Sequence, residues 1–189
     1  MKPWTVVPRT LCTLATMAVI GCGGDGTSGS DEESSEIINE VTLTLMRRQD
    51  STLQHAVITD PDGAGPLPWQ AQIGALRVVP NASYTATITL TNSTTRPPVD
   101  VTPLINSRKL QHRFFYTMLP ENGVIATDLT IDSNSADYGE AFAVHVPTAV
   151  ESRPWTLQVL LSHYVGDTKG NGLIPAPLTD VEVTFELTT

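Results

Sequence analysis

Two histidines, His112 and His163, are the residues of this sequence best suited to acid–base or metal chemistry near neutral pH. Each lies in a segment with the alternating pattern of a β-strand, LQHRFFYTM for His112 and WTLQVLLSHYV for His163. Because His163 is in phase with Leu157 and Leu161, we expect it on or near the core face at the end of its strand. Such a half-buried imidazole either binds a metal or ligand or forms a structural hydrogen bond, and the sequence leaves both interpretations open.

A calcium site is a second chemical interpretation, in the acidic segment DLTIDSNSADYGE. Asp132, Asn134 and Asp137 offer the oxygen donors that Ca²⁺ prefers, but the segment lacks the glycine and the flanking helices of an EF-hand. A solvated turn is therefore the alternative interpretation. The other two histidines, His55 and His145, are expected to be structural or surface residues.

Sequence motifs typical of enzymes are missing from the chain. It has no P-loop and no dinucleotide fingerprint, and the segment GTSGS at residues 26–30 lacks the final glycine of a G-x-S-x-G nucleophile motif. Its two cysteines, Cys12 and Cys22, both precede the segment expected to fold. We therefore predict a protein that is not an enzyme, with a divalent metal, at the histidines or in the acidic segment, as the candidate cofactor. A hydrolase with His112 or His163 as the base is the remaining alternative.

The N-terminus has the features of a bacterial lipoprotein signal. Lys2 and Arg9 precede an apolar stretch, residues 10–21, which is shorter than the roughly 20 residues of a membrane-spanning helix. The Val-Ile-Gly-Cys motif that ends at Cys22 resembles a lipobox, in which the cysteine becomes the acylated first residue of the mature protein. An ordinary secretory signal with an incidental cysteine is the alternative. In lipoproteins, a glycine such as Gly23 after the cysteine, rather than aspartate, resembles the pattern sorted to the outer membrane.

These sequence features divide the chain into three expected segments. We expect a signal peptide over residues 1–21, an acylated Cys22 with a disordered acidic Gly/Ser tether over residues 22–36, and a folded domain over residues 37–189. A tether of this composition and length spans about 20 Å, which keeps the domain near the lipid surface. The predicted localisation is the bacterial cell envelope, with membrane lipid at Cys22 as the anchor. Since 20 acidic and 11 basic residues give a net charge of −9, nucleic acid is not expected as a partner.

The segment expected to fold is rich in strand patterns. SYTATITLTN at residues 83–92 alternates apolar residues with threonine, as expected of a strand with one buried and one solvated face. Pro103 can begin one short helix, with Thr102 as its cap. The pattern predicts an all-β fold: an antiparallel, immunoglobulin-like β-sandwich of about nine strands with one short helix. The other expected strands are residues 40–45, 53–59, 75–79, 110–118, 123–131, 141–146, 155–165 and 180–188.

Several of these segments together resemble a family of small envelope lipoproteins of Bacteroidota. The resemblance rests on the opening EIINEVTLTL, on LQHRFFYTM, on LLSHYVGDTKGNG and on the closing TDVEVTFELT, and it spans roughly residues 36–189. The two recurrent histidines of the family match His112 and His163, and its closing aspartate matches Asp180. The chain departs from the family at residues 177–178, where Pro-Leu replaces a Gly-Glu pair.

The family resemblance implies a role in ligand or metal acquisition beside an outer-membrane transport receptor. It also implies that His112, His163 and Asp180 are site residues. We therefore expect a non-enzymatic binding module that assists uptake, with an outer-membrane receptor protein as its partner. The alternative is a structural or adhesive envelope protein without a small ligand. In that alternative His112 and His163 only pack, and a shift of the thermal unfolding midpoint on metal binding distinguishes the two.

Overall fold

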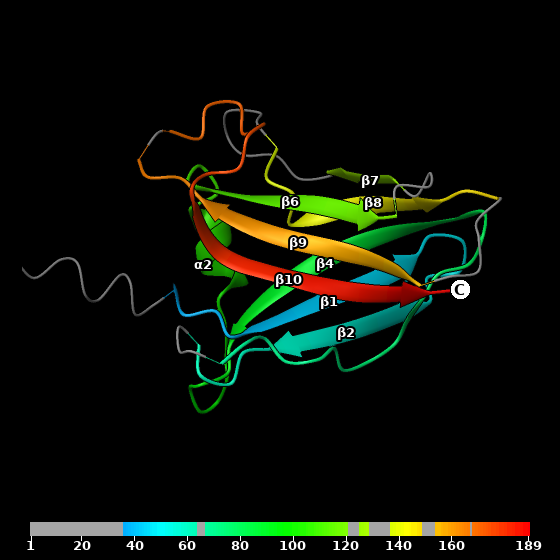
Figure 1. Ribbon diagram of the computed structural model, residues 1–189, viewed down its shortest axis with the longest axis horizontal. Coiled ribbons are helices and arrows are strands. Elements are labelled where there is room, and N and C mark those ends of the chain that lie inside the picture. Colours follow the sequence, from blue (N-terminus) through cyan, green and yellow to red (C-terminus); the bar gives the residue numbers. More distant parts are fainter. Residues whose placement is uncertain (1–35, 64–66, 121–124, 129–136, 149–153, 167) are drawn as a thin grey trace, which may run out of the picture.

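Two β-sheets stacked one on the other form the body of the molecule (Figure 1). The computed structural model describes residues 36–63, 67–120, 125–128, 137–148, 154–166 and 168–189. The expected signal peptide, Cys22 and the expected tether up to residue 35 lie outside the described residues. Of the residues described, none belongs to a helix that is long and apolar enough to cross a membrane.

The first sheet has six strands, with β2, β1, β4, β8 and β7 in that order and β5 paired with β4. All of its strand pairs are antiparallel. The strands are β1 (Glu40–Arg47), β2 (Leu53–Thr59), β4 (Ala82–Asn92), β5 (Val99–Asp100), β7 (Ile125–Asp128) and β8 (Ala141–Val146).

The second sheet has four strands in the order β3, β10, β9 and β6. Its edge strand β3 runs parallel to β10, and the other pairs are antiparallel. Figure 1 shows β6, β9 and β10 side by side in this sheet. The strands are β3 (Leu76–Arg77), β6 (His112–Leu119), β9 (Trp155–His163) and β10 (Leu178–Thr188).

The core lies between the sheets, and β4 shows why these segments form strands. Every second residue of β4 is buried, because apolar side chains such as Tyr84 and Leu90 face the second sheet while the threonines lie on the outer face. From the second sheet, Trp155 and Phe185 are fully buried in the same core.

The expected mostly-β fold with two layers and one short helix is confirmed. Residues 53–59 and 141–146 have the expected bounds, whereas β5 was not expected.

The short helix α2 (Thr102–Ser107) closes one end of the sandwich, at the end where β9 finishes and β6 begins (Figure 1). Proline occupies its first turn, as expected, but Thr102 is not its cap. Val101 is the N-cap and makes no side-chain capping bond. Instead the Thr102 hydroxyl accepts a hydrogen bond from the Leu90 amide at 2.8 Å, which ties the helix to β4. The side chain therefore satisfies a buried strand amide in place of a helix end.

Candidate metal centre

The antiparallel pairing of β6 with β9 places His112 directly opposite His163. The two ring centroids are 4.6 Å apart, and the ring planes are inclined at 51°. Both side chains lie on the core-facing side of the second sheet, because His112 is in phase with buried Phe114 and His163 with buried Leu161. The fold therefore brings together the two histidines that the sequence singles out.

A β-bulge in β10 adds the third expected residue, Asp180. The register between β10 and β9 shifts between Thr179 and Val181, so Asp180 is the extra residue without a directly paired partner. Bulges of this kind redirect a side chain. The two carboxylate oxygens of Asp180 lie 3.3 Å from His112 Nε2 and 3.3 Å from His163 Nδ1. One aspartate thus contacts both imidazoles.

The hydrogen bond of His112 shows which ring nitrogen donates. Its Nδ1 lies 3.0 Å from the backbone carbonyl of Arg108, and a carbonyl only accepts, so Nδ1 must carry the proton. In the neutral ring the lone pair is then on Nε2. The ring is fully buried, and Nε2 has no hydrogen-bond partner among the described residues, since the contact with Asp180 lacks hydrogen-bonding geometry. Histidines that bind a metal usually donate the N–H of their other ring nitrogen to a carbonyl or carboxylate in this way.

Glu36 is a fourth donor that sequence reasoning did not identify. One ligand atom from each of Glu36, His112 and His163 lies within 4.8 Å of the others. Arg108 Nη1 donates to Glu36 Oε1, which holds the carboxylate beside the histidines. We had expected Glu36 to belong to the tether, because it ends an acidic run. The one available signal was its position immediately before the apolar Ile37.

The spacing of the donors fits a tetrahedral metal ion. Zinc binds imidazole nitrogen and carboxylate oxygen at about 2.0–2.2 Å, which separates neighbouring ligand atoms in a tetrahedron by about 3.3–3.5 Å. The two contacts of Asp180 with the imidazoles are both 3.3 Å long, each through a different carboxylate oxygen. Two imidazoles and two carboxylates are donors that suit zinc and other first-row divalent metals.

Two pockets adjoin this cluster. A hollow of about 390 Å³ has Glu36, Asp60 and Asp180 in its lining. Asp60 is buried, and this burial, together with the neighbouring Asp62, raises its pKa. A second pocket of about 650 Å³ has His163 in its wall and is otherwise formed by residues 164–178 of the loop between β9 and β10 and the start of β10. Glu36, Asp180 and His163 therefore line pockets, while His112 lies behind them in the core.

The expected calcium loop is described only in part. Asp132 and Asn134 lie outside the described residues. Asp137 is described, and its Oδ2 lies 3.2 Å from Arg113 Nη2 in an ion pair. Arg113 is buried and also stacks on the ring of Phe115 at 4.6 Å. The one carboxylate of this group that the structure describes thus has a cationic partner within the protein.

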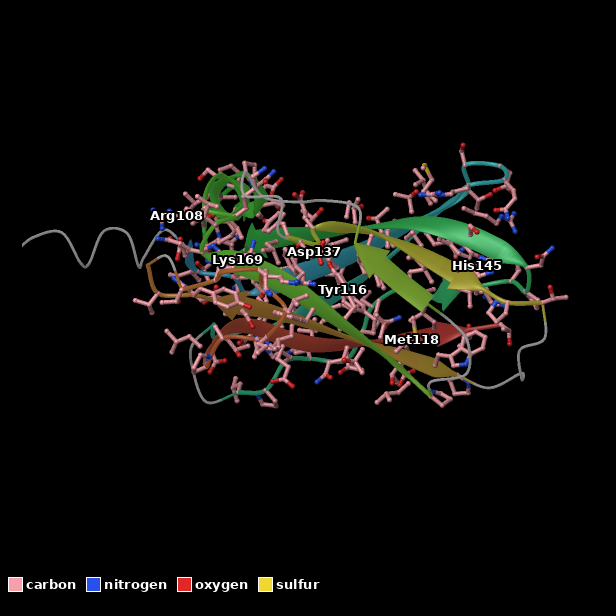
Figure 2. All side chains as sticks on the ribbon, turned by 90° about the horizontal axis from the view of Figure 1, so that it is seen from above. Arg108, Tyr116, Met118, Asp137, His145 and Lys169 are labelled. Atoms are coloured by element: carbon pink, nitrogen blue, oxygen red, sulfur yellow. The ribbon has the colours of Figure 1, made fainter. Side chains whose placement is uncertain are left out.

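The other two histidines are surface residues, as expected. His55 and His145 are exposed. His145 Nδ1 lies 3.1 Å from the hydroxyl of Ser83, its partner across β4 and β8. Figure 2 places His145 at the opposite end of the sandwich from Arg108 and Lys169, which lie at the end with the histidine cluster.

Comparison with known proteins does not assign the chain to a family. No protein-family model matches it, and no curated protein or solved structure matches it either. Its function must therefore be argued from the site itself.

Proposed function

We propose that this chain is a non-enzymatic, envelope-anchored binding module that holds a first-row divalent metal, with Zn²⁺ as the leading ion. The ligands are His112, His163, Asp180 and Glu36. Metal acquisition beside an outer-membrane receptor protein is the role we infer, because the domain is expected to be anchored by lipid at Cys22. An immunoglobulin-like topology of the sandwich is part of the same proposal, and the two stacked, largely antiparallel sheets support it.

The buried Nε2 of His112 is the observation that carries this proposal. A buried polar atom without a partner costs about 1–3 kcal/mol, so a protein retains one where it serves a purpose. Here the lone pair of Nε2 lies beside a second imidazole and two carboxylates. A metal bound by these groups would be a partner for Nε2, and its positive charge would reduce the repulsion between the carboxylates of Asp180 and Glu36.

Whether the metal is only held depends on Asp180. Catalytic zinc keeps three protein ligands and one position for water or substrate, whereas zinc that is only held has four protein ligands. Glu36, His112 and His163 are three mutually close donors, and Asp180, 3.3 Å from both imidazoles, would be the fourth. In addition, no hydroxyl group of the described residues is hydrogen-bonded to His112 or His163, as a serine nucleophile would be to its base.

Thermal unfolding of the purified mature chain with chelator and then with Zn²⁺, Cu²⁺ or Ca²⁺ tests the proposal. The chain must include Glu36, since a fragment that begins at residue 37 lacks one ligand. Zinc at about 100 times its dissociation constant should stabilise the protein by about 2.7 kcal/mol, which raises the unfolding midpoint by several degrees. The change His163→Ala should abolish this shift, because the ring is partly exposed and its loss leaves the core intact.

The matched control is His145→Ala, which removes a surface histidine at the other end of the sandwich. It should leave the zinc shift unchanged. If zinc still raises the unfolding midpoint of His163→Ala, the zinc is not bound at this site. The same conclusion follows if His145→Ala also abolishes the shift. No shift with any metal would favour the structural or adhesive alternative, in which Asp180 and the two histidines form only an internal polar cluster.

A further inference from the structure

The segment Leu173 to Leu178, with the sequence LIPAPL, is an exposed apolar strip without a charged residue. Leu173 is 66% exposed, Ile174 77% and Leu178 53%. Val165, from the same connection between β9 and β10, is 66% exposed. Exposed runs of this length are uncommon on soluble domains and mark interaction surfaces. We call Val165 and residues 173–178 the apolar strip.

The apolar strip lies at the end of the sandwich where the described chain begins. Leu178 pairs with His163 in the sheet, and a ligand atom of His163 lies within 4.8 Å of one of Glu36. Figure 1 shows the loop between β9 and β10 at the same end as α2 and the start of β1. The described chain therefore begins beside the strip.

We propose that the apolar strip inserts into the surface of the membrane that anchors the chain through Cys22. This rests on the lipid anchor in our proposed function. From Cys22 to Glu36, a chain of this composition spans about 20 Å, so the strip is held within reach of the lipid. Amphipathic helices at a membrane surface bury their apolar face by about 5–10 Å at the boundary between headgroups and acyl chains, and we expect the exposed apolar loop to enter the same region.

Lipid suits the strip better than a charged partner. The strip offers no charge for an ion pair, and the net charge of −9 gives the chain no attraction to anionic lipid, so burial of apolar side chains and the short anchor must drive the contact. The acyl chains already hold the protein on the membrane. The strip would therefore fix orientation, and it would turn the metal centre toward the lipid, where a membrane receptor lies.

Depth-dependent fluorescence quenching tests this with the full acylated chain in vesicles of phosphatidylethanolamine and phosphatidylglycerol. A fluorophore is attached at Ile174→Cys, which is the one free thiol once Cys12 is removed with the signal and Cys22 is acylated. Lipids brominated in the acyl chain should quench it. The matched control is a fluorophore at Leu53→Cys, which is 64% exposed at the opposite end of the sandwich.

We expect several-fold stronger quenching at position 174 than at position 53. Equal quenching at the two positions would overturn the inference. In a second pair of chains, the fluorophore is at Val165→Cys and Leu173→Glu is added to one of them. The added charge should reduce quenching to the level at position 53. It should leave the unfolding midpoint in detergent unchanged. Undiminished quenching would also overturn the inference.

Mass spectrometry of the same chain separates the two levels of the proposal. A chain without acyl mass at Cys22 overturns both the lipid anchor and the insertion of the strip. An acylated chain that shows no preferential quenching overturns the insertion alone and leaves a protein partner as the occupant of the strip. The zinc shift is measured independently of either outcome.

Discussion

The cross-strand pairs of His112 and His145 have very different surroundings. His112 faces His163 across β6 and β9, and His145 faces Ser83 across β4 and β8. His145 is exposed and lies within hydrogen-bonding distance of a hydroxyl, while His112 is fully buried and its Nε2 has no hydrogen bond in the described part of the chain. The comparison shows that strand pairing alone does not make a site. Burial, a bulge that redirects Asp180 and a carboxylate from Glu36 distinguish the first pair from the second.

Among these variants, removal of Asp180 should weaken zinc binding most. The change Asp180→Ala deletes a carboxylate that lies 3.3 Å from each of the two imidazoles. Even the loss of an outer partner weakens metal sites by about 10–100-fold, so we expect the zinc dissociation constant to rise more than about 100-fold in calorimetric titration. Ser83→Ala, beside His145, should leave it unchanged. Equal zinc affinities in these two variants would remove the distinction between the two pairs.

Glu36→Gln should have a smaller effect on the same titration. The amide keeps the shape of the side chain and an oxygen but loses the charge, and the other three donors remain. We expect zinc to bind about 10-fold more weakly. Without metal, the unfolding free energy should change by less than about 1 kcal/mol, because the ion pair with Arg108 is partly exposed. A loss of affinity as large as that of Asp180→Ala would show that Glu36 is as central as Asp180.

The change His112→Leu distinguishes a metal-binding role of His112 from a structural role in packing. An apolar side chain of similar size removes the unpartnered Nε2 but also leaves the Arg108 carbonyl without its donor. These two effects oppose each other, so the metal-free protein should unfold within about 1 kcal/mol of the parent in urea titration. The zinc shift should vanish. A metal-free variant that is several kcal/mol less stable would indicate that His112 is a structural residue.

The smallest predicted effect is on stability, and it concerns Glu140, which immediately precedes β8, the strand of His145. Burial, followed by the nearby Asp100, raises the pKa of Glu140 above its ordinary 4.5. A carboxyl group with a raised pKa in the folded state lowers stability as pH rises from the unfolded value through the folded value. Glu140→Gln should therefore raise the unfolding midpoint at pH 7 and have no such effect below about pH 4. A larger gain at pH 4 than at pH 7 would reverse this assignment.

The sequence predicted much of the fold because strand formation here is a local property. Alternation of apolar residues with threonine located β4 and its buried face, and the same pattern located β8 and β10. The short strand β5 was missed, since two residues carry no periodicity. Thr102 was assigned to the wrong role, because a helix cap and a bond to Leu90 require the same hydroxyl, and only the packing of α2 on β4 selects between them.

By itself the sequence determined the residue types of the site and the strands that carry His112 and His163, since both follow from local pattern and chemistry. Only the tertiary structure decided that these imidazoles meet, because strand register is a long-range property. The bulge that turns Asp180 toward them and the approach of Glu36 were likewise decided by tertiary structure. A metal site needs donors placed within a few tenths of an ångström, and such placement arises from the packing of segments that are distant in the sequence.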